Sequence, residues 1–458
     1  MRNLVEDALK GAGADYAEIR IEERETTRIA FRGRTLEEIG MSVTLGGNVR
    51  ALVRGGWGFV SFDGIGELKE RVRLAVSQAR LATTGNGRAS QLSPVEPVID
   101  SVKAQLVKDP RHIPLSTKKR LLEEYNEIIL NSGPRIQTST ILYVETFTKK
   151  YFANTEGTYI DQEASDIGAN ITAIARDGDN VQQCFLPAGG TTGFQTVEGL
   201  HERVRDIARR AIEMLDADPV KAGEYTVVIN PGLAGVFVHE AFGHLSESDF
   251  VYENERLQEI MTMGARFGPD ILNIVDGAAV EGHRGSYRYD DEGVPSRMTH
   301  LIRNGILVGR LHSRETAAKM GERPTGNARA INYRHRPIVR MTNTFIENGT
   351  TSFEDMISDI KEGVYAIEAY GGETAMEMFT FSAGEAFMIR NGKIAERVRD
   401  VVLTGNLFDT LKNIECIGND FEWHDGGAGG CGKGAQFPLP VGDGGPHVRI
   451  RKVVIGGR

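Results

Sequence analysis

The spacing of apolar side chains predicts four amphipathic helices in the first half of the chain. Apolar residues recur every three or four positions in four segments, which gives each segment one apolar face: residues 2–11, 65–82, 116–130 and 198–215. Ser116 is a candidate N-cap of the third helix, because a serine hydroxyl there can accept a hydrogen bond from the first helical turn.

Strand patterns lie between these helices. Alternating and β-branched residues predict strands at residues 16–22, 26–31, 41–45 and 49–54, and strand character returns across 136–185. Gly46-Gly47 separates two of the predicted strands and indicates a hairpin turn.

The second half of the chain is dominated by short strands. Residues 224–230 predict a strand, residues 233–245 an apolar helix, and residues 352–360 a further short helix. Hairpin turns are expected at Asn304-Gly305 and at Asn391-Gly392.

Helices and strands occur in blocks rather than in strict alternation, which favours an α+β fold. We expect an N-terminal α/β domain over residues 1–219, with a mixed or antiparallel sheet and long helices. A C-terminal β-rich domain over residues 220–458 would carry the apolar helix. The boundary falls where proline, glycine and aspartate collect between residues 216 and 223.

Composition narrows the class of protein. Of the 458 residues, 40% are hydrophobic and 26% are charged, which excludes wholesale disorder. No apolar stretch approaches the roughly 18 residues of a membrane helix, and the first residues lack the apolar core of a secretory signal. We therefore expect a cytoplasmic protein with no membrane partner. The net charge of -9 argues against general nucleic-acid binding.

The segment HEAFGH, residues 239–244, is the strongest chemical signal in the chain. Two imidazoles and a carboxylate this close together suit a divalent zinc ion. The histidines are five residues apart, however, so an ideal helix would hold them about 140° from each other. One π-type bulge would realign them, and Gly243 would make the distortion easier. The alternative is a buried helix with two core histidines, in which Glu240 would be a costly buried charge.

A zinc ion with an open position needs a third protein ligand. Cys431 lies in a span that contains nine glycines, residues 424–446, which we expect to be an irregular loop able to approach the metal closely. From the residues alone the candidates for the third ligand are Cys431, Cys416, His447, His424, Glu247 and Asp249.

Several blocks of the sequence resemble the TldD/PmbA family of zinc metalloproteases. They are HEAFGHLSESD, DDEGVPSRMTHLIRNGILVGRLHSRETA, PTGNARA, PIVRMTNTFIENG and CGKGAQFP. The resemblance extends over nearly the whole chain, and the HExxxH motif is similar to the TldD half of the family. It implies that His239, His244 and Cys431 bind Zn2+ and that Glu240 is catalytic. It also implies a dimer that encloses the zinc in a cavity.

The favoured hypothesis is a zinc-dependent peptidase that hydrolyses unfolded or leader-type peptides with a metal-activated water. Its partner would be a second copy of the chain or a PmbA/TldE-like paralogue that lacks the motif. Two alternatives remain open. One is a non-catalytic regulatory subunit with a structural zinc, and the other is a metal-dependent hydrolase of a non-peptide bond. The acidic cluster of residues 290–292 could bind calcium, but it lacks EF-hand spacing.

Overall fold

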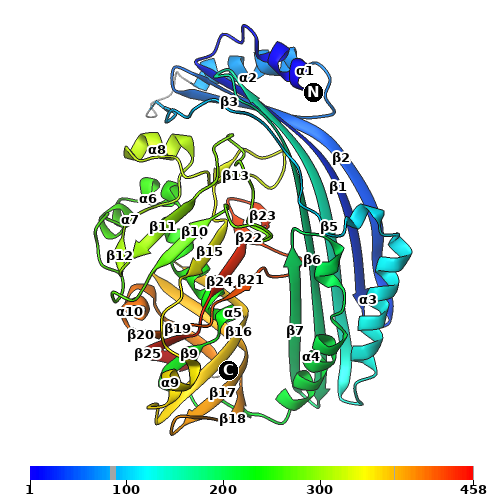
Figure 1. Cartoon of the computed structure of the whole chain (residues 1–458), viewed down its shortest axis with the longest axis vertical. Helices are drawn as coiled ribbons and strands as arrows, with labels where there is room; N and C mark the ends of the chain where they lie inside the picture. The colour runs from blue at the N-terminus through cyan, green and yellow to red at the C-terminus, as the bar shows by residue number, and fades with distance from the viewer. Residues whose placement is uncertain (83–88, 376, 457–458) are drawn as a thin grey trace.

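The computed structural model describes residues 1–82, 89–375 and 377–456. A long, curved sheet built from the first half of the chain forms one side of the molecule, and the second half packs on its concave side (Figure 1). The structure has several sheets together with helices, which confirms the predicted α+β class. Among the described residues, no helix is both long and apolar enough to span a membrane.

The N-terminal sheet is built mainly from antiparallel strands, several of them 17 to 19 residues long. Its strands, in spatial order, are β3 (Gly56–Asp63), β2 (Thr35–Val53), β1 (Tyr16–Arg32), β5 (Ile136–Asn154) and β6 (Tyr159–Asp177); β4 (Ile99–Val102) and β7 (Asn180–Gly190) both pair with β6. The register aligns even-numbered residues of β1, β5 and β6 with one another. Because side chains alternate along a strand, even-numbered residues of these three strands lie on one face of the sheet and odd-numbered residues lie on the other.

Four helices cover the odd-numbered face, as the apolar pattern predicted. They are α1 (Arg2–Leu9), α2 (Leu68–Ala82), α3 (Leu115–Leu130) and α4 (His201–Met214). The first two pack on one end of the sheet and the last two on the other, each pair over its own apolar cluster. The prediction of Ser116 as an N-cap was wrong. Helix α3 begins one residue earlier, after Pro114, and no side chain caps it.

The predicted hairpin at Gly46-Gly47 was also wrong. Strand β2 runs straight through both glycines, and the chain turns at Gly33-Arg34 instead. A Cβ atom on Gly46 would lie 2.3 Å from the ring of Tyr333, and one on Gly47 would lie 2.6 Å from the carbonyl oxygen of Arg20. Gly46 therefore permits close packing of Tyr333 from the second half of the chain, and Gly47 permits close packing against the neighbouring strand β1; neither forms a turn.

The second half contains a closed barrel and a smaller sheet. The sheet that contains the barrel has eight strands, namely β16 (Glu362–Ala375), β9 (Gly223–Ile229), β25 (Val448–Gly456), β19 (Val402–Asn406), β17 (Met378–Arg390), β18 (Lys393–Arg399), β8 (Asp218–Pro219) and β20 (Ile414–Ile417). The first five of these form the closed barrel, because β16 also pairs with β17. The smaller sheet contains β12 (Ile306–Leu307), β11 (Met298–Arg303), β10 (Ile274–Gly277), β15 (Asn343–Ile346), β24 (Gly442–Gly445) and β21 (Glu422–His424).

Two short hairpins and several short helices complete this half. The hairpins are β13 (Ala328–Arg329) with β14 (Ile338–Val339), and β22 (Cys431–Lys433) with β23 (Gln436–Leu439). The helices are α5 (Pro231–Val238), α6 (Ser248–Glu253), α7 (Glu255–Ile260), α8 (Arg314–Met320), α9 (Phe353–Ile357) and α10 (Leu407–Lys412). The turns predicted at Asn304-Gly305 and Asn391-Gly392 are confirmed, and all four residues have positive φ. The glycine-rich span is not wholly irregular, because β22, β23 and β24 lie within it.

Buried ion pairs join the two halves of the chain. Arg20 of β1 and Lys150 of β5 contact the carboxylate of Asp291 at 3.1 and 2.8 Å, and Arg50 of β2 contacts Glu292 at 2.9 Å. Two of the three acids considered as a calcium site, Asp291 and Glu292, are thus engaged by cationic side chains of the N-terminal sheet.

Candidate metal centre

Helix α5 delivers the histidine motif to the centre of the second half. Its first turn is capped by Asn230, whose side chain accepts a hydrogen bond from the Leu233 amide at 3.0 Å. The helix is apolar on all sides and contributes to the largest core cluster. Gly235 lets it approach β24, since a Cβ atom there would lie 2.4 Å from the carboxylate of Asp443. The helix is therefore held rigidly before it reaches His239.

A π-helical turn follows at once, at His239–Gly243, and confirms the predicted bulge. It brings the two histidine rings to a centroid distance of 5.3 Å. Gly243 does not ease the distortion through unusual torsions, because its φ is -58°. Instead it makes room for Met341, whose sulfur would lie 2.0 Å from a Cβ atom at that position.

Cys431 reaches the histidines from the β22–β23 hairpin. The buried guanidinium of Arg340 donates to the carbonyl oxygens of Cys431 and Gln436, at 2.7 and 3.3 Å, and so fixes both strands. The Cys431 Sγ lies 3.3 Å from Nε2 of His244. One ligand atom each from His239, His244 and Cys431 lies within 4.8 Å of the others. The structure thus brings together the three residues that the family resemblance names as metal ligands.

The other candidate ligands have different partners. His424 contacts Asp443 at 3.2 Å and His447 contacts Asp420 at 2.7 Å. Asp249 accepts a hydrogen bond from Lys433 at 2.6 Å. Among the described residues, the group that could hold a metal contains no fourth histidine, cysteine or acidic side chain. A zinc ion held by these three side chains would keep a position open for water.

The donor set fits zinc. Two imidazoles and a thiolate are the ligands that zinc prefers. Burial alone would raise the pKa of the Cys431 thiol, but the neighbouring imidazoles of His239 and His244 lower it to about 4. The Nδ1 atom of His239 is buried and forms no hydrogen bond to any described residue. A buried polar atom of this kind is costly unless a further ligand satisfies it.

Glu247 orients His244. Its carboxylate is fully buried and lies 3.1 Å from Nδ1 of His244, 3.0 Å from Nζ of Lys433, and 3.2 Å from the Met341 amide, which donates to it. Burial would raise the pKa of Glu247, but Lys433 and His244 outweigh it and lower the pKa to about 2. The negative charge of Glu247 favours a proton on Nδ1 of His244, and Nε2 of the same ring faces Sγ of Cys431. The sequence suggested Glu247 only as a possible ligand.

Replacement of Glu247 by glutamine is expected to weaken zinc binding about 10- to 100-fold, because His244 loses its charged hydrogen-bond acceptor. Competition with a chromogenic chelator measures the affinity. Glu255→Gln, at an exposed position of α7, is the matched control. An unchanged affinity in Glu247→Gln would show that His244 needs no such support.

Glu240 lies beside the three ligands. Its Oε2 atom is 3.9 Å from Nε2 of His244, and 26% of its side chain is exposed. Glu240 is thus not the fully buried charge that the alternative of a helix with two core histidines would require. A carboxylate that solvent can reach is suited to proton transfer.

Comparison with known proteins shows the family of this chain. Models of the PmbA/TldA metallopeptidase domain 1, central domain and C-terminal domain match residues 17–80, 108–217 and 222–457. The chain belongs to the PmbA/TldD metallopeptidase family. A metalloprotease of Synechocystis sp. is 48% identical over 445 residues, which cover 97% of this chain and 95% of the relative. A zinc metalloprotease TldD homolog of Saccharolobus solfataricus is 30% identical over 463 residues, 97% of each chain.

Solved structures share the fold. TldE from Thermococcus kodakarensis has a TM-score of 0.75 at 18% identity and covers 100% of both chains. A putative modulator of DNA gyrase from Bacteroides thetaiotaomicron has a TM-score of 0.78 at 16% identity, covering 100% of this chain and 99% of its own. At these identities the likeness shows the fold alone.

Proposed function

We propose that this chain is a zinc-dependent peptidase that hydrolyses unfolded or leader-type peptides. His239, His244 and Cys431 would hold the zinc, and Glu240 would be the catalytic base. The observation that carries the proposal is the approach of three donor atoms to within 4.8 Å of one another beside a partly exposed carboxylate. The absence of a fourth ligand among the described side chains favours catalysis over a structural zinc.

Each side chain of the site would have a separate role in hydrolysis. A bound zinc ion supplies Lewis acidity, which makes a water molecule more acidic and a peptide carbonyl more electrophilic. Glu240 accepts the proton of the attacking water and donates it to the departing amine. Glu247 holds the ring of His244 in place, and Lys433 neutralises the buried carboxylate of Glu247. Arg340 keeps the hairpin of Cys431 fixed.

The names of relatives support the reaction and a partner. Curated relatives along nearly the whole chain are named metalloproteases, one of them a zinc metalloprotease. The shared fold with TldE supports either a homodimer or a heterodimer with a TldE-like paralogue. We place this assembly in the cytoplasm.

Metal analysis of the purified chain tests the proposal. We expect about one zinc ion per chain, loss of this zinc in Cys431→Ala, and retention of it in the control Cys416→Ala. A zinc-loaded wild-type chain should also cleave members of a library of unfolded peptides. Zinc retained by Cys431→Ala would contradict the ligand assignment, and a library left intact would contradict the peptidase.

A further inference from the structure

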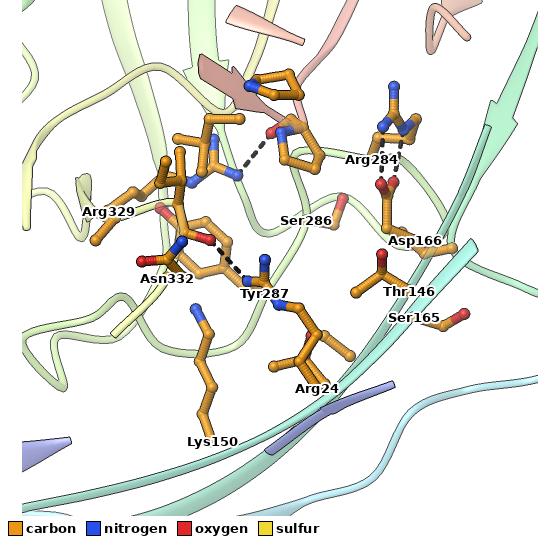
Figure 2. Close-up of a pocket in the computed structure, with 18 of the residues that line it drawn as sticks. Arg24, Thr146, Lys150, Ser165, Asp166, Arg284, Ser286, Tyr287, Arg329 and Asn332 are labelled. Carbon is orange, nitrogen blue, oxygen red and sulfur yellow. Dashed lines mark hydrogen bonds and ion pairs between the residues drawn. The ribbon is translucent and has the colours of Figure 1, made fainter. Parts of the chain in front are cut away.

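A cavity of about 410 Å³ lies between the concave face of the N-terminal sheet and the second half of the chain. Even-numbered residues of β1, β5 and β6 form one wall, and residues 284–291 and 329–332 form the opposite wall (Figure 2). Residues 428–429 and 437–440 close one end. We call this space the sheet cavity. The three proposed metal ligands are not among its lining residues.

Cationic side chains outnumber carboxylates around the sheet cavity. The lining contains five cations, namely Arg24, Arg28, Lys150, Arg284 and Arg329, and three acids, namely Asp166, Asp290 and Asp291. The difference, 5 - 3, is two positive charges, in a chain whose net charge is -9. Two of the cations also have carboxylate partners outside the lining, because Arg24 contacts Glu22 and Arg28 contacts Glu38. The attraction of the cavity for an anion therefore depends chiefly on Arg329.

The three carboxylates are already engaged by the protein. Asp166 accepts two hydrogen bonds from Arg284, at 2.6 and 2.8 Å. Asp291 contacts Lys150 and accepts the Ala330 amide at 2.8 Å. Asp290 accepts backbone amides of residues 292, 294 and 328. These acids therefore oppose a bound anion only weakly.

Arg329 is the buried cation of the lining that lacks a carboxylate partner among the described residues. It is 7% exposed, and it donates to the carbonyl oxygens of Met341 and Pro440, both at 2.6 Å. No carboxylate of a described residue forms an ion pair with it. A guanidinium carries five N–H donors, so these two bonds leave donors in reserve. A buried charge without a counter-ion is costly, and a ligand carboxylate would offset that cost.

Arg24 offers a second free donor. Its Nη2 atom donates to the Ile331 carbonyl at 2.7 Å and contacts Glu22, but its buried Nε forms no hydrogen bond to a described residue. Figure 2 shows Arg24 and Lys150 reaching from the sheet toward Tyr287 and Asn332.

The sheet cavity adjoins the strand that carries the thiolate. Its lining residue Leu439 pairs directly with Cys431 across the β22–β23 hairpin. Phe437, 67% exposed, adds an apolar surface from the same hairpin. The volume suits a few residues rather than a folded domain. A peptide segment near the scissile bond would therefore fit this combination of charge and apolar contact.

We propose that the sheet cavity binds a carboxylate of the peptide substrate, supplied by its C-terminus or by an aspartate or glutamate side chain. This inference rests on the proposed peptidase function and gives that function a preference for acidic peptides. Guanidinium groups suit it because they recognise carboxylates through parallel N–H donors.

Peptide binding to the zinc-loaded Glu240→Ala variant tests the inference, because the peptide should stay intact during the measurement. Fluorescence anisotropy compares a peptide with its Glu-to-Gln counterpart, and a C-terminal acid with its amide. We expect Arg24→Met to weaken binding of the carboxylate peptide about tenfold and to leave the neutral peptide unchanged. Arg32→Met is the matched control, because this exposed residue of β1 lies outside the cavity. If binding falls when Glu is replaced by Gln in the peptide, the carboxylate comes from a side chain. If binding falls when the C-terminal acid is replaced by the amide, the carboxylate comes from the C-terminus.

Arg28→Met provides a second test, because 45% of its side chain is exposed and, among the described residues, it pairs only with the exposed Glu38. Its loss should therefore not prevent folding. It should lower affinity for the same peptide. Equal binding of acidic and neutral peptides by every variant would overturn the inference, as would displacement of the peptide by low concentrations of inorganic phosphate. Hydrolysis by the wild-type chain is measured separately. Hydrolysis without charge preference would refute only the carboxylate site, and charge-dependent binding without hydrolysis would refute only the peptidase.

Discussion

Replacing Glu240 by glutamine should lower kcat/KM for peptide hydrolysis about 10²- to 10⁴-fold, because the amide can neither accept the proton of water nor pass it to the amine. Zinc content should stay unchanged, since the three proposed ligands His239, His244 and Cys431 are intact. Cleavage of an unfolded peptide, followed by mass spectrometry with metal analysis on the same sample, measures both quantities.

A matched control is Glu259→Gln, at an exposed position outside the ligand group, which should keep full activity. Two results would contradict the role of Glu240. One is activity within about threefold of wild type, and the other is a loss of activity that only accompanies a loss of zinc.

Replacing Asp291 by asparagine should reduce the free energy of unfolding by about 3–5 kcal/mol, because the buried Arg20 would lose its counter-charge and the partly exposed Lys150 would lose its ion pair. Burial would raise the pKa of Asp291, but Lys150 and Arg20 outweigh it and lower the pKa. A group with a lowered folded pKa stabilises the fold above its unfolded pKa, about 3.9, and this contribution is lost as pH falls below that value. Denaturant titrations at pH 7 and at acidic pH measure both effects.

Asp270→Asn is the control, because Asp270 pairs with Arg266 on the surface and should contribute less than about 1 kcal/mol. The difference in stability between wild type and Asp291→Asn should narrow at acidic pH. A difference that stays constant down to pH 3, or one as small as that of the control, would show that the pairs at Asp291 do not join the two halves of the chain.

The sequence was most informative where one local pattern decides the structure. Apolar spacing located all four N-terminal helices because each needs only one buried stripe. The five-residue spacing of His239 and His244 indicated the π turn because no regular helix aligns them. The sequence pattern left Cys431 as one of several candidates for the third metal ligand. Only the resemblance to the TldD/PmbA family singled it out.

Structural features that depend on residues distant in the sequence could not be predicted from the local sequence pattern. The hairpin expected at Gly46-Gly47 does not form. Gly46 instead lies against Tyr333, nearly 290 residues away in the sequence, and the local pattern gives no sign of this contact. In the same way, Asp291 is explained only by strands β1 and β5, and Glu247 only by Lys433. The pattern of a chain does not reveal which cation a buried acid will meet.

The β22–β23 hairpin has a consequence for engineering. One short ribbon presents the thiolate of Cys431 on one strand, while Phe437 and Leu439 of the other strand line the sheet cavity. Lengthening or shortening this ribbon would move both features together. Redesign of ligand preference would therefore be safer on the opposite wall, at β1, where side chains can be exchanged without shifting the thiolate.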